Sequence, residues 1–233
     1  MCAKIITGGG ADRVTYDGPN YYPFTYRKTF AAWVLRTTNP DPNLYRIAGD
    51  SDSAGGNRWV WGSNNNGGQA PFPGLRLYVY AAGGTYQRGH IIPYPSLNVW
   101  HHLCFTLDQT SMATAPTIYV DGAAVGASVV DGGTAAVSTA TMALRLGNNG
   151  SGTNGWPGQI QNEAYWDDIL SLAEIQALAK GVNPHRIRPT RLVFHYPMLV
   201  GGGEADWASG RAGVAVGASM TPALVPSGPL IVV

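Results

Sequence analysis

Short runs in which apolar and polar residues alternate recur along this chain, separated by turn residues. In one run, Leu75, Leu77 and Val79 fall on one face of an extended strand, and the residues between them fall on the other. Another run is followed by Asp121-Gly122, a dipeptide typical of tight hairpin turns. Alternation with period two and regular turn signals predicts an antiparallel sandwich or barrel. The runs are 29–35, 75–80, 102–107, 118–120 and 144–146.

A single helix is predicted late in the chain. Residues 171–174, Ser-Leu-Ala-Glu, have the sequence of a capping box, in which the first and last side chains bond each other's backbone amides. Apolar residues then recur at helical spacing over 172–179. Gly181 ends the helix, and Pro184 prevents it from continuing.

The composition supports a globular all-β protein and excludes several classes. Charged residues make up only 12% of the 233 residues, whereas 31 are Gly and 16 are Pro, which argues against a helical bundle. A hydrophobic content of 45% argues against disorder. The net charge of +1 comes without a basic stripe, so we expect no nucleic-acid partner. No apolar run approaches the ~18 residues of a membrane span, so we expect no membrane insertion.

Two cysteines, Cys2 and Cys104, are too few for a disulfide framework. Cys104 lies in an apolar strand pattern, which predicts a buried free thiol. The first ten residues lack the apolar stretch of a signal peptide. We therefore expect a protein made in a cytoplasm.

Several segments together resemble the laminin-G-like, concanavalin A-like lectin/glucanase jelly-roll family. Residues 98–108 resemble its "W-H-H-V-A-x-T-x-D" strand, and residues 118–122 resemble the "Y-V-D-G" hairpin that follows. The order and spacing of the motifs agree over residues 11–180. The resemblance implies an all-β jelly-roll sandwich of two antiparallel sheets with one short helix in the C-terminal half. We expect a single domain over 1–233. Further matching segments are 29–34, 146–147, 157–160 and 165–179.

The chain departs from the family pattern in two ways. A string like the family's opening strand lies near the end, over 192–199 and 206–210, so we expect 191–218 to complete the sandwich and 219–233 to form a tail. Glu163 stands where the family usually has an aliphatic residue. Because a buried carboxylate needs partners, either Glu163 pairs with an arginine or the strand register shifts there.

The relocated strand and the tail after "N-P-H-x-I" (183–187) resemble proteins encoded near bacteriophage structural genes. The resemblance implies a non-enzymatic virion protein of the capsid-decoration or head-fibre type, assembled in the host cytoplasm. Its expected partners are the major capsid protein, other virion proteins and sister subunits in a homo-oligomer. The apolar end, Leu230, Ile231, Val232 and Val233, is the expected partner contact.

The alternative function is a glycan-binding adhesin or lectin module that recognises a cell-surface glycan. Aromatic rings pack on the C–H faces of sugars, while polar groups fix the orientation. Equally, such rings fill cores and subunit interfaces, and the sequence favours that role over sugar binding. The candidate rings are Trp59, Trp61, Tyr78, Tyr80 and Trp156, of which Tyr78 and Tyr80 share a face with Arg76.

A calcium site is a further possibility, since no other cofactor is indicated. Asp50, Asp52 and Asn57 offer the clustered oxygen ligands that Ca²⁺ prefers, although the same residue types simply make polar turns. The spacing is not that of an EF-hand loop.

We expect no enzyme activity, with a glycoside hydrolase or lyase as the third and least favoured function. Glycosidases need two carboxylates flanking the bond, and Glu163, Glu174 and Glu204 are the chain's only glutamates. Glu174 is explained by its capping box, and the sequence shows no Ser-His-Asp arrangement.

Overall fold

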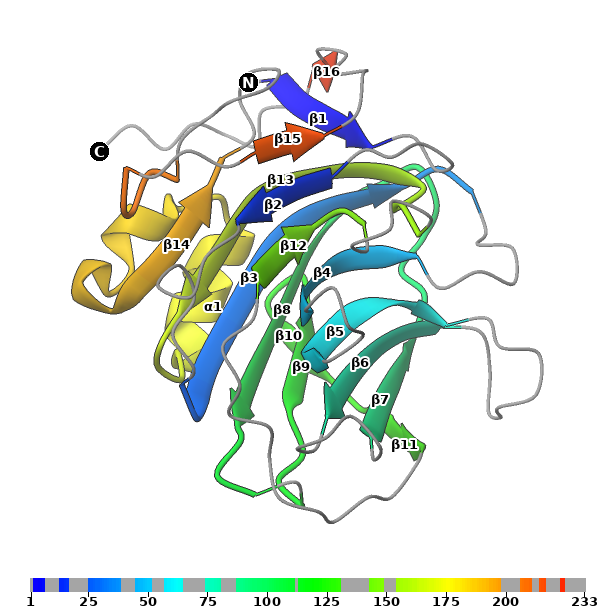
Figure 1. Ribbon diagram of the computed structural model, residues 1–233, viewed down its shortest axis with the longest axis vertical. Coiled ribbons are helices and arrows are strands. Elements are labelled where there is room, and N and C mark those ends of the chain that lie inside the picture. Colours follow the sequence, from blue (N-terminus) through cyan, green and yellow to red (C-terminus); the bar gives the residue numbers. More distant parts are fainter. Residues whose placement is uncertain are drawn as a thin grey trace.

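Two antiparallel sheets form a sandwich in the computed structural model of this chain (Figure 1). No helix in the described part of the chain is long and apolar enough to cross a membrane. The structure describes residues 2–6, 13–16, 25–38, 45–51, 57–64, 74–80, 87–111, 113–130, 143–148, 154–197, 206–210, 214–216 and 223–224.

Sheet 1 is built around three long central strands. Its order is β10-β9-β8-β3-β13-β1-β16, and β14 also pairs with β13. The strands are β10 (Ala123–Val125), β9 (Thr117–Val120), β8 (Trp100–Asp108), β3 (Arg27–Arg36), β13 (Gly158–Trp166), β1 (Cys2–Ile6), β16 (Ala223–Leu224) and β14 (Leu192–Tyr196).

Sheet 2 faces sheet 1 and has the order β11-β7-β6-β5-β4-β12-β2-β15. Together the two sheets confirm the predicted jelly-roll sandwich. The strands are β11 (Ser128–Val130), β7 (Gln87–Pro93), β6 (Gly74–Tyr80), β5 (Asn57–Asn64), β4 (Arg46–Ser51), β12 (Ala143–Leu146), β2 (Arg13–Tyr16) and β15 (Val214–Val216).

Four aromatic rings hold the two sheets together. Phe30 and Phe105, from neighbouring strands of sheet 1, stack with their centroids 5.9 Å apart. The rings of Trp59 and Trp61, from sheet 2, each lie 5.2 Å from the Phe105 ring. All four side chains are fully buried. Edge-on and offset ring contacts of this kind add stabilisation beyond the burial of their area.

The central strand β13 carries an irregularity at the unusual residue Glu163. Its pairing with β3 shifts register between Gln161 and Ala164, and Asn162 adopts a positive φ of 51°. Glu163 itself has no exposed surface. The register shift, one of the two alternatives that the sequence offered for this position, is observed.

Both sheets receive strands from the C-terminal part of the chain. The segment 191–218, which the sequence predicts to complete the sandwich, contributes β14 and β15. β14 pairs with β13, and β15 pairs with β2. Asp206 fastens the following turn to β14, because its carboxylate accepts a hydrogen bond from the backbone amide of His195 at 2.7 Å.

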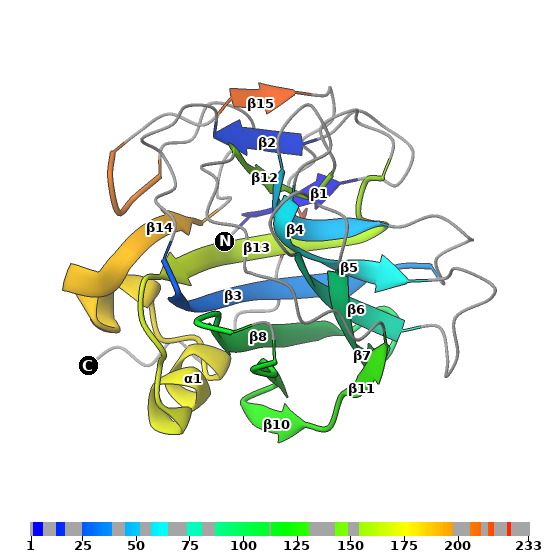
Figure 2. The same ribbon diagram turned by 60° about the horizontal axis from the view of Figure 1, so that its bottom comes forward.

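Helix α1 (Leu172–Ala179) covers the outer face of sheet 1, where it contacts β8 (Figure 2). The predicted capping box is present: the Ser171 hydroxyl accepts from the Glu174 amide, and the Glu174 carboxylate accepts from the Ser171 amide. A second apolar cluster, which includes Cys104, Trp166 and Ile175, lies beneath the helix. Cys104 is the predicted buried free thiol, and burial raises its pKa.

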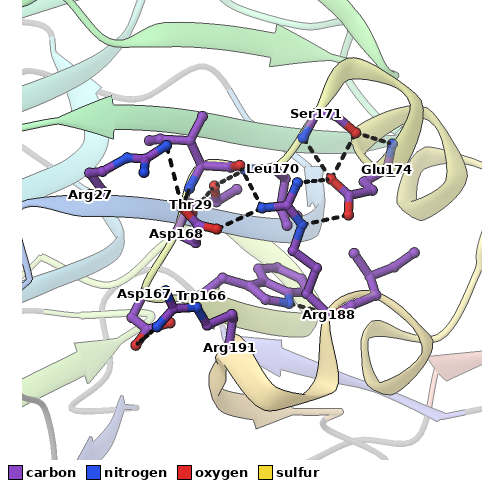
Figure 3. A network of polar contacts seen from close by, with 12 residues as sticks. Arg27, Thr29, Trp166, Asp167, Asp168, Leu170, Ser171, Glu174, Arg188 and Arg191 are labelled. Carbon is purple, nitrogen blue, oxygen red and sulfur yellow. Dashed lines mark hydrogen bonds and ion pairs between the residues drawn. The ribbon is translucent and has the colours of Figure 1, made fainter.

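Arg188 ties the helix to the sheet (Figure 3). It lies between two short 3-10 turns, Pro184–Arg186 and Pro189–Arg191, in a left-handed conformation. Its guanidinium donates to both carboxylate oxygens of Glu174, at 2.6 and 2.8 Å, and to Asp168 at 2.7 Å. Such forked, charge-assisted bonds need an arginine and fix its geometry.

Arg188 affects the pKa values of the two carboxyl groups that it contacts, those of Asp168 and Glu174. Desolvation acts to raise the pKa of Asp168, but the Ile169 amide and the guanidinium groups of Arg27 and Arg188 lower it overall. Desolvation also opposes ionisation of Glu174, and hydrogen bonds from Arg188 and Ser171 again lower the pKa. Both carboxylates therefore stabilise the folded state above their unfolded pKa values and lose that contribution as the pH falls through their folded ones.

Replacing Arg188 by methionine should lower the free energy of unfolding at neutral pH by about 1–3 kcal/mol, because two carboxylates lose their charged partner. Arg191 is a matched control, since it is more exposed and lies 3.6 Å from Asp167. Arg191→Met should change the free energy by less than about 1 kcal/mol. Urea unfolding of both variants tests this, and equal losses would contradict the role given to Arg188.

Candidate functional site

The outer face of sheet 2 combines arginine and tyrosine side chains. On β5 and β6, Trp59, Trp61, Leu75, Leu77 and Val79 point into the core. Successive strand residues point to opposite faces, so the residues between these project away from sheet 1. We call Tyr45, Arg46, Arg76, Tyr78 and Tyr80 the Arg–Tyr face.

A shallow depression with an enclosed volume of about 30 Å³ lies on this face. Arg76 and Tyr78 are buried in it, whereas Tyr45, Arg46 and Tyr80 keep part of their surface exposed. Gly62 allows the close approach of the segment before β4, since a Cβ there would lie 2.0 Å from the carbonyl oxygen of Tyr45. The residues that line the depression are Tyr45, Arg46, Val60, Gly62, Ser63, Arg76, Tyr78 and Tyr80.

Arg76 is held flat against the sheet between a ring and a glycine. Its guanidinium carbon lies 3.7 Å from the centre of the Tyr78 ring, a close cation–π contact. On the neighbouring strand β7, Gly89 leaves room for it, because a Cβ at Gly89 would lie 2.4 Å from the Arg76 Nε. The position of this charge is therefore fixed before any ligand binds.

Arg46 and Tyr80 influence each other across the depression. Desolvation lowers the pKa of Arg46, Tyr80 opposes that shift, and repulsion from Arg145 on β12 adds to it. Burial raises the pKa of Tyr80, while Arg46 and Arg76 act in the other direction. The hydroxyl of Tyr80 therefore stays neutral, and it lies within electrostatic reach of two guanidinium groups.

The carboxylates whose side chains the structure describes lie away from the Arg–Tyr face. Every carboxylate whose side chain the structure describes belongs to sheet 1 or to a segment attached to it. None of these described carboxylates lines the depression. These carboxylates are Asp108, Asp121, Glu163, Asp167, Asp168, Glu174 and Asp206.

Of the five rings considered for sugar binding, three lie elsewhere. Trp59 and Trp61 are fully buried between the sheets, and Trp156 is 1% exposed in the same core. Their rings present no face to a sugar, so the prediction is corrected for these residues and their role is core packing. Tyr78 and Tyr80 do line the depression.

Sequence reasoning missed Tyr45, Arg46 and Ser63 as lining residues. Arg76, Tyr78 and Tyr80 alternate along one strand and can be recognised as a group in the sequence. Tyr45 and Arg46 reach the site only because β4 pairs with β5, where Arg46 lies opposite Gly62. No local sequence pattern predicts the pairing of β4 with β5.

The other predicted sites fall largely outside the described residues. The side chains of Asp50, Asp52 and Asn57 are not described, so the calcium site stays a prediction. The described residues contain no group of three or more His, Cys, Asp or Glu side chains able to hold a metal ion. Leu230, Ile231, Val232 and Val233 also lie outside the described residues.

The structure brings a serine, a histidine and an aspartate into one hydrogen-bonded series, which the sequence did not predict. Ser96 Oγ lies 2.8 Å from His101 Nε2, and His101 Nδ1 lies 2.7 Å from Asp121 Oδ2. Hydrolysis would also need amide donors for an oxyanion. Two amides of this region are already used: Asn98 donates to the Arg36 carbonyl, and His102 donates to the Asp121 carboxylate. We assign the series a structural role in tying the loop before β8 to the β9–β10 turn.

Three other histidines are buried and poorly protonated. Burial lowers the pKa of His102 to about 4. Burial also lowers the pKa of His90 to about 4 and that of His195 to about 3, with added repulsion from Arg88 and His185 respectively. We assign these histidines to packing inside the fold. The His102 ring, for example, lies edge-on to Trp33, 5.5 Å away.

Comparison with known proteins identifies the sandwich. The profile of the concanavalin A-like lectin/glucanases superfamily matches residues 8–176. No curated protein sequence matches the chain.

Solved structures with the same fold include binding proteins of distant sequence. A protein from Bacteroides ovatus ATCC 8483, classed as a candidate carbohydrate-binding protein, has a TM-score of 0.63 and 16% identity. The match covers 95% of this chain and 62% of that protein, so this chain spans under two thirds of it. A heptameric SAP-like pentraxin from Limulus polyphemus has a TM-score of 0.55 and 15% identity, over 76% and 82% of the two chains. The receptor-binding domain of botulinum neurotoxin C/D mosaic serotype has a TM-score of 0.53 and 12% identity, over 76% and 42%.

The buried histidines should make stability depend on pH. Each binds a proton more readily in the unfolded chain, where its pKa is about 6.5, so the free energy of unfolding falls as the pH is lowered from about 6.5 towards 4. Each contributes a slope of up to about 1.4 kcal/mol per pH unit. His102→Gln should flatten the dependence by that amount in urea unfolding across this range. An unchanged slope in the variant would contradict burial of a neutral His102.

Proposed function

The chain belongs to the concanavalin A-like lectin/glucanase superfamily, and from this premise we propose that it is a non-enzymatic carbohydrate-binding protein whose site is the Arg–Tyr face. The observation that carries the proposal is the depression on sheet 2. It combines tyrosine rings with guanidinium donors that are positioned in advance.

The chemistry of the depression suits a sugar. Tyr45 and Tyr80 are only partly buried, and we expect a pyranose C–H face to pack on the ring of Tyr80. The Tyr80 hydroxyl and the Arg46 guanidinium supply hydrogen bonds to sugar hydroxyl groups. The depression is shallow, with an enclosed volume of about 30 Å³, so a sugar residue would rest on it with one face instead of being enclosed.

Binding rather than hydrolysis is supported by the distribution of carboxylates. Glycosidases place a pair of carboxyl groups around the bond that they cleave. The described residues that line the depression include none. We therefore assign the face to recognition alone.

The virion role stays a prediction from the sequence. A sugar-binding module is compatible with attachment of a virion to a cell surface, and the same chemistry serves other settings. Capsid proteins, other virion proteins and sister subunits remain the partners expected from that resemblance, with the virion as the expected location.

Tyr80→Ala should weaken glycan binding about tenfold or more, because the sugar loses both a ring and a hydroxyl contact. Tyr26→Ala is the control, since Tyr26 is 47% exposed and precedes β3 of sheet 1. A glycan array identifies a ligand, and calorimetry compares the variants. Because we propose binding without hydrolysis, the glycan recovered after incubation with the protein should be as long as the glycan that was added. Equal affinity of both variants would remove the Arg–Tyr face from the proposal, and shortened glycan would indicate hydrolysis.

Gly89→Ala should also weaken binding severalfold, although it removes no polar or aromatic group. The new Cβ would displace the Arg76 guanidinium from its place against Tyr78. Gly126→Ala is the matched control, because a Cβ there meets nothing within 4 Å. Calorimetry with the same glycan compares the two, and identical affinities would show that the position of Arg76 does not matter for binding.

A further inference from the structure

We propose that the Arg–Tyr face selects acidic sugars, with Arg46 binding the carboxylate or sulfate group of the ligand. This inference rests on the proposed function and specifies its ligand class. It follows from the charge in the depression, which exceeds what a neutral sugar requires.

Arg46 is a charged group without a partner among the described residues. Its side chain is half-buried and lines the depression, yet it makes no hydrogen bond or ion pair within the described part of the chain. Its backbone amide, by contrast, is fixed by a 2.9 Å bond to the Asn154 carbonyl. The Arg46 guanidinium can therefore donate two parallel hydrogen bonds to a planar anion that binds in the depression.

The surroundings make an anion favourable at this position. Desolvation and repulsion from Arg145 both act against the charge of Arg46. An anionic ligand would relieve that repulsion, and its attraction would be strengthened by partial burial of the pair. Arg76 contributes a further fixed positive charge on the same face. A neutral sugar would leave this electrostatic cost in place.

The described carboxylates do not compete for Arg46. They all belong to sheet 1 and its attached segments, and the ion pairs of Asp168 and Glu174 are made there with Arg27 and Arg188. Among the described residues of sheet 2, an approaching acidic glycan meets the guanidinium groups of Arg46 and Arg76.

The ring and hydroxyl of Tyr80 give the site its sugar character. A simple inorganic anion would use Arg46 but would not use the ring, whereas an acidic pyranose uses both. We therefore expect the sugar ring to lie near Tyr80 and its acidic group to reach Arg46.

The test uses the full chain and glycans in matched pairs that differ only in charge. The pairs are 3′-sialyllactose with its carboxyl-reduced form, tri-galacturonate with its methyl ester, and a chondroitin sulfate oligosaccharide with its desulfated form. At least one acidic member should bind about tenfold more tightly than its neutral partner, because charged hydrogen bonds are the stronger ones. The first two pairs report a carboxylate and the third reports a sulfate.

Variants of Arg46 assign the preference to this residue. Arg46→Met should abolish the difference within a pair, because loss of the positive charge should lower the affinity for the acidic member much more than the affinity for the neutral member. Arg46→Lys should retain part of the preference for the acidic member, because lysine keeps the positive charge but cannot donate two parallel hydrogen bonds. Arg191→Met, in the 3-10 turn before β14 of sheet 1, should leave the preference unchanged. Rising salt should weaken only the acidic members.

The outcomes separate the two proposals. Equal affinity for both members of every pair would overturn the acidic-sugar inference and leave carbohydrate binding intact. A preference that survives Arg46→Met would overturn the assignment to Arg46. Failure of the wild-type protein to bind any glycan on an array, neutral or acidic, would overturn the proposed function itself.

Discussion

The contact between Phe30, Phe105, Trp59 and Trp61 sets the relation between the two sheets, and the outer surfaces follow from it. Once Trp59 and Trp61 point inward, the intervening residue Val60 must point outward. The same alternation on β6 turns Arg76, Tyr78 and Tyr80 away from the core. The binding face is therefore a consequence of core packing, and a change of register by one residue would remove both together.

The way in which each sheet holds its charged groups is the second organising feature. The carboxylates described on sheet 1 accept hydrogen bonds from backbone amides, from the forked guanidinium of Arg188 and within the capping box of α1. Sheet 2 holds arginines against tyrosine rings and a glycine. Low charge overall is thus compatible with strong local fields, because the charges that exist are partly buried and firmly placed.

Local sequence patterns predicted the strands, the capping box and the buried thiol well, because each depends on neighbours within a few residues. The role of Trp59 and Trp61 was not predictable from alternation, which shows that two rings share a face but not which face is covered. The series from Ser96 through His101 to Asp121 depends on hairpin geometry, and Arg46 depends on the pairing of β4 with β5. Such sites are assembled from distant segments, so their chemistry is visible only once the strand order is known.

Strand β13 pairs with β3 along one edge and is shared between two other strands along the opposite edge, and this sharing has a consequence for how the protein folds. One half pairs with β1, at residues Lys4–Ile6, and the other half pairs with β14, which follows it in the chain. β1 must wait for more than half of the polypeptide to be synthesised before its partner exists, and such non-local pairings form slowly. Until then an apolar strand stays available to the wrong neighbour. The pairing of β1 with β13 is therefore a late step in folding, and the exposure of an unpaired strand ends only with it.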